Sequence, residues 1–218
     1  MPVVRAELVP KGPYSLRLSG RHASDATRVV VDGTYRAVIR VDDRVERVQA
    51  AQGVDGTVVV AAESDAGIDH VRFALALDDD HSEFVRRFAD DRLLGETLRR
   101  VRGLRPMRTG SVAQSLLRAV AGQLIRASEA RRIERRIIRT TTPALGDLHA
   151  APTAAELGRF ETKPSRRGAV ASIAELFGWF FRGGVTPVKL AAAAAAVATT
   201  ATLAVAPVVR PQPTPPTA

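Results

Sequence analysis

Two groups of side chains between Ser111 and Thr140 have the types and spacing to do chemistry. Five arginines recur at spacings of three and four residues and so share one face of a helix, namely Arg131, Arg132, Arg135, Arg136 and Arg139. Guanidinium groups form planar, bidentate hydrogen bonds with phosphate. Upstream, Gln123 is a lone amide in an apolar run, directly after the helix-weakening Gly122. These residues predict an anion-binding helix beside an amide that is able to bind a ligand.

Two helices are needed to position these groups. The first has an apolar stripe of helical period that must pack against other helices, made of Val112, Leu116, Leu117, Val120 and Leu124. The second carries Ile133, Ile137 and Ile138 opposite its arginines. We expect a break between the helices, with Ser128 as the N-cap of the second. Gln123 would then lie at the surface between the two helices.

The positive charge is concentrated in the middle of the chain. The 218 residues have a formal net charge of +9, and 45% of them are hydrophobic, enough for a core. Residues 81–142 hold fifteen arginines and six acidic residues, a balance of +9, whereas residues 1–80 hold ten basic and thirteen acidic residues, a balance of −3. We expect fourteen of the fifteen arginines, all except Arg92, to stay solvated without special pairing, and the basic region to attract nucleic-acid phosphate. A high-GC genome, which favours arginine codons, would give the same composition without such a partner.

Residues 1–80 have a strand-like pattern followed by a helix. Alternation and β-branched runs predict an antiparallel meander, in which Leu16 and Leu18 alternate along an early strand. Tight turns are expected at Asp32-Gly33 and Asp42-Asp43. A helix capped by Ser64 or Asp65 would cover the sheet. The sequence thus predicts an α+β fold that begins with a small antiparallel-sheet domain.

The remaining chain divides into a helical region, residues 81–160, and a tail, residues 161–218. Short apolar clusters predict two helices around Phe84 to Phe88 and Leu93 to Leu98. Thr153 and Glu156 have the spacing of a capping box. The tail contains an aromatic-rich helical pattern from Ile173 to Phe181. It also contains the uncharged, alanine-dominated run Leu190 to Val209, which is long enough to span a bilayer.

The sequence lacks the residues that several classes of chemistry require. The absence of cysteine excludes disulfides, thiolate catalysis and cysteine-bound zinc, and fits a reducing cytosol. The four histidines show no metal-ligand spacing, so we expect no metal and no cofactor. They are His22, His70, His81 and His149. Phosphate-binding glycine loops and a recognisable Ser-His-Asp order are absent, and the charged, proline-broken start is not a signal peptide.

Three blocks of the sequence resemble the DNA-3-methyladenine glycosylase II family, the AlkA-like branch of the helix-hairpin-helix DNA glycosylases. In the family's order they are VRFALALDDD at residues 71–80, FVRRF leading to DDRLLG at residues 84–95, and LRAVAGQLI at residues 117–125. The third block is the sharpest, because it is similar to the family's Ala-Ile-x-x-Gln-Leu-Ile/Val helix. The resemblance covers about residues 1–160.

The resemblance implies a TATA-binding-protein-like N-terminal domain packed on a helical domain that takes up alkylated double-stranded DNA. In such enzymes the damaged base is flipped into a pocket. A carboxylate then stabilises the oxocarbenium-like sugar while water completes hydrolysis of the N-glycosidic bond. Gln123 matches the family's pocket glutamine and would contact the flipped base. The alternative is that Gln123 only caps backbone at the helix break.

The sequence departs from the family where the chemistry should be. The family's Pro-Gly-Ile/Val-Gly hairpin and its catalytic aspartate have no counterpart, and no aspartate follows Asp147. The remaining carboxylates, Glu156, Glu161 and Glu175, stand in no comparable context. The change of character near Phe160 resembles a truncation with a replacement tail. We therefore expect no catalytic residue in this chain.

The sequence as a whole predicts a base-excision-repair glycosylase relative that is inactive in this form, a cytoplasmic, nucleoid-associated monomer. Its expected DNA-binding residues are Gln123 for the base and Arg126, Arg131, Arg132, Arg135, Arg136 and Arg139 for phosphates. One alternative is a non-catalytic basic DNA-binding module unrelated to repair. Another is a tail-anchored membrane protein, which is disfavoured because alanine contributes little insertion free energy.

Overall fold

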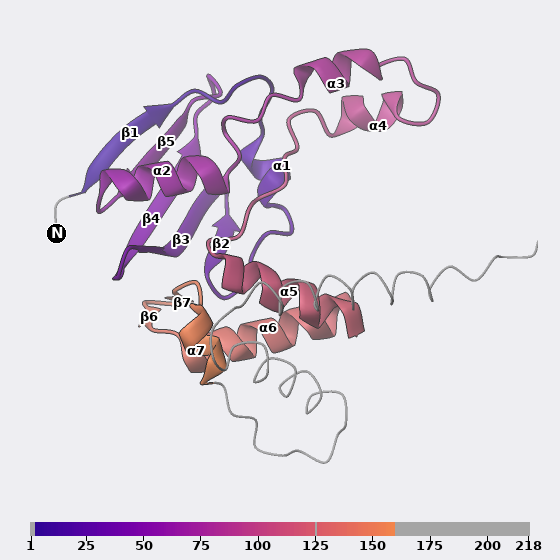
Figure 1. Ribbon diagram of the computed structural model, residues 1–218. Coiled ribbons are helices and arrows are strands. Elements are labelled where there is room, and N and C mark those ends of the chain that lie inside the picture. The colour runs from indigo at the N-terminus through magenta and orange to yellow at the C-terminus, as the bar shows by residue number, and fades with distance from the viewer. Residues whose placement is uncertain (1–2, 125, 160–218) are drawn as a thin grey trace, which may run out of the picture.

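The computed structural model describes residues 3–124 and 126–159 (Figure 1). Its largest unit is a five-stranded antiparallel sheet with the strand order β1-β5-β4-β3-β2. The strands are β1 (Val4–Leu8), β2 (Arg28–Val31), β3 (Thr34–Val41), β4 (Arg44–Gln52) and β5 (Val58–Ala62). Strands β2 to β5 form the predicted meander, and β1 closes the sheet beside β5. The α+β class expected from the sequence is confirmed.

The two predicted tight turns are present and set the register of the meander. Asp32 and Gly33, between β2 and β3, both have positive φ, 51° and 73°. Two successive left-handed residues make the type I′ turn, whose twist matches that of paired strands. Asp42, which opens the turn between β3 and β4, also has φ 51°. These turns place alternate side chains of each strand on the same face of the sheet.

Helix α2 (Asp65–Ala74) covers one face of the sheet, as predicted (Figure 1). The Ser64 hydroxyl accepts a hydrogen bond from the Gly67 backbone N–H at 3.1 Å and so caps the first turn. Ile68 and Val71 of α2 pack into the main core against the inward-facing side chains of the strands. This core includes Tyr35, Ile39, Val48, Val58 and Val60.

The expectation of a strand through Leu16 and Leu18 is wrong. These residues lie in a one-turn helix, α1 (Leu16–Gly20), because the Ser15 hydroxyl accepts the backbone N–H of Leu18 at 3.3 Å. Leu16 is only 1% exposed and joins the main core. The apolar side chain of Leu16 is therefore buried by a single helical turn and not by the strand that the sequence pattern predicted.

Beyond the sheet the described chain is mostly helical. Helices α3 (Ser82–Arg87) and α4 (Gly95–Arg100) form a small hairpin that extends away from the sheet, and a linker then returns to α5 (Val112–Leu124) and α6 (Ala127–Thr141) (Figure 1). The positions of α3 to α6 agree with the predicted apolar clusters. The described chain ends with the hairpin β6 (Ala144–Leu145) and β7 (Leu148–His149), which the sequence did not predict, and with α7 (Ala154–Gly158).

Helices α5 and α6 pack against each other around Leu117, Ile137 and Ile138. Two further members of the predicted α5 stripe, Leu116 and Val120, are half-buried against this cluster. Val112 does not take part in the packing. Its side chain is 83% exposed because it stands in the first, solvent-facing turn of the helix.

The prediction that Ser128 is the N-cap of α6 is wrong. The helix begins at Ala127, two residues earlier than a cap at Ser128 would give, and Arg126 occupies the cap position without a side-chain hydrogen bond. Ser128 lies inside the first turn with an exposed side chain. The predicted break between α5 and α6 is nevertheless present, and it turns the chain so that the two helices lie side by side (Figure 1).

The predicted capping box of α7 is confirmed. The Thr153 hydroxyl accepts the Glu156 N–H at 3.2 Å, and Glu156 Oε2 accepts the Thr153 N–H at 2.8 Å. The aromatic segment from Ile173 to Phe181 and the apolar run Leu190 to Val209 lie outside the described residues. Within residues 3–124 and 126–159, no helix combines the length and the apolar character needed to cross a membrane.

Candidate nucleic-acid interface

The arginine face of α6 is exposed. The six predicted DNA-binding arginines all point into solvent, namely Arg126, Arg131, Arg132, Arg135, Arg136 and Arg139. Ile137 and Ile138 occupy the opposite side of the helix and are 3% and 0% exposed. Among the described residues only Arg132 of this set has an acidic partner, Glu129, at 3.6 Å. The helix therefore presents a nearly uncompensated row of guanidinium groups.

The arginine face borders a hollow of about 800 Å3. One wall consists of the α6 residues Ser128, Arg131, Arg132, Arg135, Arg136, Arg139 and Thr140. The other wall comes from the loop between α1 and β2 and contributes His22 and Ser24. The sequence reasoning missed this second wall, because about a hundred residues separate the loop from α6.

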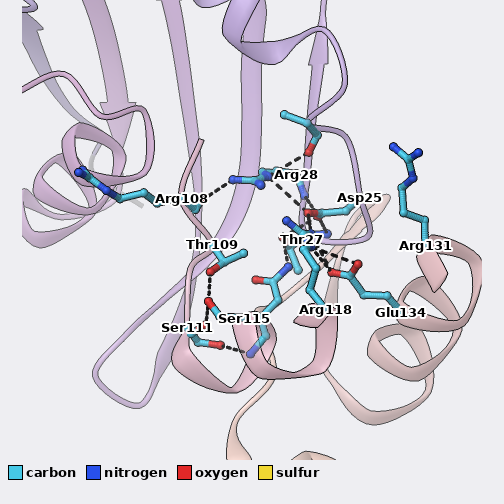
Figure 2. Close-up of polar contacts among 12 residues, drawn as sticks. Asp25, Thr27, Arg28, Arg108, Thr109, Ser111, Ser115, Arg118, Arg131 and Glu134 are labelled. Atoms are coloured by element: carbon cyan, nitrogen blue, oxygen red, sulfur yellow. Dashed lines mark hydrogen bonds and ion pairs between the residues drawn. The ribbon is translucent and has the colours of Figure 1, made fainter. Parts of the chain in front are cut away.

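A buried ionic network fixes the loop to the two helices (Figure 2). Arg118 Nη2 of α5 donates to Asp25 Oδ2 of the loop at 2.7 Å and to Glu134 Oε1 of α6 at 2.7 Å. The two carboxylate side chains are 6% and 3% exposed. Burial acts to lower the pKa of Arg118, but the hydrogen bonds and charges of Glu134 and Asp25 outweigh it and raise the pKa above its usual range. The guanidinium therefore keeps its charge in the network.

Further hydrogen bonds connect this network to neighbouring segments. Asp25 Oδ1 accepts the Thr27 N–H at 2.7 Å and the Arg28 N–H at 3.1 Å. Arg28 also donates to the carbonyl of Arg108 in the linker before α5, and Gln114 Nε2 of α5 donates to the Thr27 hydroxyl at 3.3 Å. A buried charge that is paired and hydrogen-bonded is tolerated, whereas an unpaired one is costly. The start of β2, the linker, α5 and α6 are thus joined at one point.

The expectation that the arginines of residues 81–142 other than Arg92 stay solvated without special pairing is wrong for Arg105, Arg108 and Arg118. Besides Arg118, Arg105 is 1% exposed, and its guanidinium donates to the carbonyls of Ala76, Leu77, Lys11 and Pro13. Burial lowers the pKa of Arg105. Arg108 forms a bidentate pair with Asp79, at 2.9 Å to each oxygen. Arg105 and Arg108 therefore anchor the linker to the end of α2 and to the loops around it.

Gln123 lies in the last turn of α5 with an exposed side chain. It lines neither the hollow of the arginine face nor the larger one of about 930 Å3 between α1, α3, α4, α5 and α6, although its neighbour Gly122 borders the larger hollow. The structure thus places Gln123 and the α6 arginines on consecutive helices and does not bring them into one pocket.

The carboxylates near the interface are already engaged. Asp25 and Glu134 are held by Arg118, and Glu129 lies beside Arg132. Glu156, a remaining candidate for catalysis, accepts two hydrogen bonds from Arg40 Nη2 at 2.9 and 3.1 Å as well as those of its capping box. Glu161 and Glu175 lie outside the described residues.

No protein-family profile matches the chain, and no curated protein sequence matches it. Among solved structures, it is similar to a 3-methyladenine DNA glycosylase from Archaeoglobus fulgidus, with a TM-score of 0.64 and 20% sequence identity over 82% of this chain and 66% of that one. An apo 8-oxoguanine glycosylase/lyase from Clostridium acetobutylicum matches with a TM-score of 0.60 and 16% identity, over 84% of this chain and 63% of that one. The same Clostridium enzyme in complex with double-stranded DNA containing cytosine opposite 8-oxoguanine matches equally, with a TM-score of 0.60 and 16% identity, over 85% of this chain and 67% of that one.

The matched enzymes differ in the damaged base that their names specify, so the likeness concerns the framework that they share. The present chain spans about two thirds of their length. At these sequence identities the comparison establishes architecture, and the chain has the fold of the DNA glycosylases.

Proposed function

We propose that this protein binds double-stranded DNA through the arginine face of α6, as a relative of the alkylation-repair glycosylases that itself releases no base. The observation that carries the proposal is the row of exposed, almost unpaired arginines on a helix of a glycosylase fold. A cationic row of this kind attracts a nucleic acid whatever its base sequence. The planar guanidinium groups can form bidentate hydrogen bonds with phosphate.

The length of the row fits several phosphates. Arg131 and Arg139 are eight residues apart, which corresponds to about 12 Å along a helix. One strand of duplex DNA presents a phosphate about every 3.4 Å along its axis. If the row runs along the duplex axis, it spans three to four phosphates of one strand, about 12 Å at about 3.4 Å each. Binding should weaken with salt, with a slope of log affinity against log salt of about −0.9 per neutralised phosphate.

The proposed lack of base release is supported by the state of the described carboxylates. Hydrolysis of an N-glycosidic bond needs a carboxylate that faces the oxocarbenium-like sugar. Asp25, Glu134 and Glu156 are each held by an arginine in the structure, and no aspartate follows Asp147 in the sequence. Freeing any of the three would leave a buried guanidinium or carboxylate without its partner, which is costly.

Gln123 is proposed as a contact to an extruded base rather than as a catalytic group. Its amide is exposed at the end of α5, one turn before the basic helix begins. An amide both donates and accepts, as recognition of a base edge requires. Replacing Gln123 by alanine should weaken binding to methylated duplex about threefold to tenfold, the loss of one hydrogen bond. Gln49→Ala, at an exposed position of β4, is the matched control.

The experiment that tests the proposal is a single-turnover base-release assay on methylated duplex, at protein concentrations that saturate the DNA. The expected result is complete binding with no 3-methyladenine or 7-methylguanine released above a protein-free blank. Release above the blank would show that another carboxylate serves the reaction. Failure to bind the duplex at all would refute the proposal as a whole.

A further inference from the structure

We infer that the loop between α1 and β2 forms the second half of the phosphate site, so that a DNA phosphodiester group is held between His22 and Ser24 on one side and Arg131 and Arg135 on the other. The inference rests on the proposed function, because it names how the same surface grips DNA. It adds a contact from the sheet-containing part of the chain to a surface otherwise made by one helix.

The shape of the surface carries the first part of the argument. His22, Ser24 and the arginines of α6 line one hollow of about 800 Å3, large enough for a phosphate group with its flanking sugars. Glu129, whose side chain is 50% exposed, is the acidic partner of Arg132, while the buried Glu134 is turned inward to Arg118. Figure 2 shows Arg131 extending away from Glu134 and free of the buried network. The hollow is therefore strongly cationic.

The two walls are held at a fixed separation. Asp25 directly follows Ser24, and Glu134 directly precedes Arg135. Arg118 bridges the two carboxylates at 2.7 Å each, so one guanidinium ties the loop to the helix. A site whose walls are already in place loses little conformational freedom when it binds a ligand. This arrangement distinguishes the hollow from a row of arginines on a free helix.

The hydrogen-bond donors in the hollow suit an anion. Ser24 Oγ accepts the backbone N–H of Val30 at 3.3 Å, which leaves its own proton to donate. Thr140, by contrast, donates to carbonyls of its own helix and is not available. The imidazole of His22 is exposed and carries at least one N–H donor. Guanidinium, hydroxyl and imidazole groups thus converge on a ligand that only accepts hydrogen bonds, as a phosphodiester does.

Affinity measurements on matched variants provide the first test. Duplex binding is measured for the full chain, for His22→Ala, for Ser24→Ala and for His81→Ala, which removes an exposed histidine outside this hollow. We expect His22→Ala to weaken binding about threefold to tenfold and His81→Ala to leave it unchanged. Thermal unfolding of His22→Ala should match that of the parent, since the side chain is exposed.

A tethered cleavage reagent tests the location directly. The chain has no cysteine, so His22→Cys creates a single attachment point for an iron chelate that cuts nearby DNA. Asp69→Cys, at an exposed position of α2, is the control. We expect cleavage of bound duplex from position 22 and none from position 69. Because the readout is a cut in the duplex, free phosphate in the hollow does not produce it.

The outcomes separate the two levels of the claim. Weaker binding by His22→Ala together with cleavage from position 22 supports the two-walled site. Unchanged affinity in both loop variants and no cleavage from position 22, while the parent chain still binds, overturns the inference and leaves the α6 proposal standing. Absence of duplex binding by the parent chain overturns the proposed function and the inference with it.

Discussion

The arginines of residues 81–142 divide into two kinds with different tasks. Those of α6 are exposed and almost unpaired, whereas Arg105 and Arg118 are enclosed by carbonyls or carboxylates. The first kind retains its full attraction for phosphate, and the second kind makes its hydrogen bonds inside the protein. Substitutions of the two kinds of arginine should therefore affect different properties of the protein. Loss of an exposed arginine should affect DNA binding, and loss of an enclosed one should affect stability.

Arg118→Met should lower the free energy of unfolding by about 3 kcal/mol. The substitution leaves Glu134 buried without its cation, whereas Asp25 keeps its ion pair with Arg28 at 3.3 Å. Breaking a buried pair typically costs about 3–5 kcal/mol, and the lower end applies because Asp25 stays paired and the Arg118 side chain is 37% exposed. Urea unfolding measures the change. Arg132→Met, which removes only the surface pair with Glu129, should cost less than about 1 kcal/mol. Equal losses in the two variants would contradict a central role for the Arg118 network.

Sequence reasoning identified the exposed arginines but not the enclosed ones. Spacings of three and four residues place the α6 arginines on one face, and that local signal sufficed. Arg118 contacts Asp25 and Glu134 only after the chain has folded, and no spacing along the sequence predicts contacts of this kind. The same holds for His22 and Ser24. Contacts made between distant segments are therefore the part of the candidate site that remained hidden.

At the scale of single elements, strong local patterns succeeded and short elements failed. The long periodic stripes of α5 and α6, the Asp32-Gly33 turn and the Ser64 cap were each predicted from chemistry within a few residues. Helix α1 and the hairpin of β6 and β7 were missed. A one-turn helix and a two-residue strand carry too few residues to show a period, so tertiary packing decides their conformation.

The docking of α2 on the sheet should depend on pH through Glu46. This side chain of β4 lies beneath α2, 6% exposed, and accepts a hydrogen bond from the Ser64 hydroxyl at 3.0 Å. Burial raises the pKa of Glu46, only partly offset by that hydrogen bond. Because the folded-state pKa exceeds the unfolded one, stability is greatest while Glu46 is protonated and declines as the pH rises through the folded pKa.

Glu46→Gln should therefore stabilise the protein by about 1 kcal/mol at about pH 7 and have little effect at about pH 4. The amide retains a hydrogen bond to Ser64 without a buried charge. Denaturant unfolding at the two pH values measures the difference. Glu7→Gln, on the exposed side of β1, controls for the change in net charge. If Glu46→Gln were less stable than the parent at neutral pH, the ionised carboxylate would be needed under α2.

At the scale of the whole molecule, the chain combines the framework of a DNA glycosylase with a surface suited to a phosphate backbone. It spans about two thirds of the length of the structures that it matches. The same framework serves enzymes named for different damaged bases, so architecture alone does not select a substrate. The features of this chain that support the proposed function are the arginine face of α6 and the network that holds it against the loop between α1 and β2.

The most direct measurement of the central claim is the affinity for duplex DNA across a range of salt concentrations. The parent chain is compared with Arg131→Ala/Arg135→Ala/Arg139→Ala and with Arg86→Ala/Arg92→Ala/Arg100→Ala, a control with the same loss of charge at exposed positions around α3 and α4. The parent should lose affinity steeply with salt, and the α6 variant should have a slope shallower by about 0.9 for each lost phosphate contact. The control variant should keep the slope of the parent. Equal slopes in the two triple variants, or binding insensitive to salt, would contradict the account.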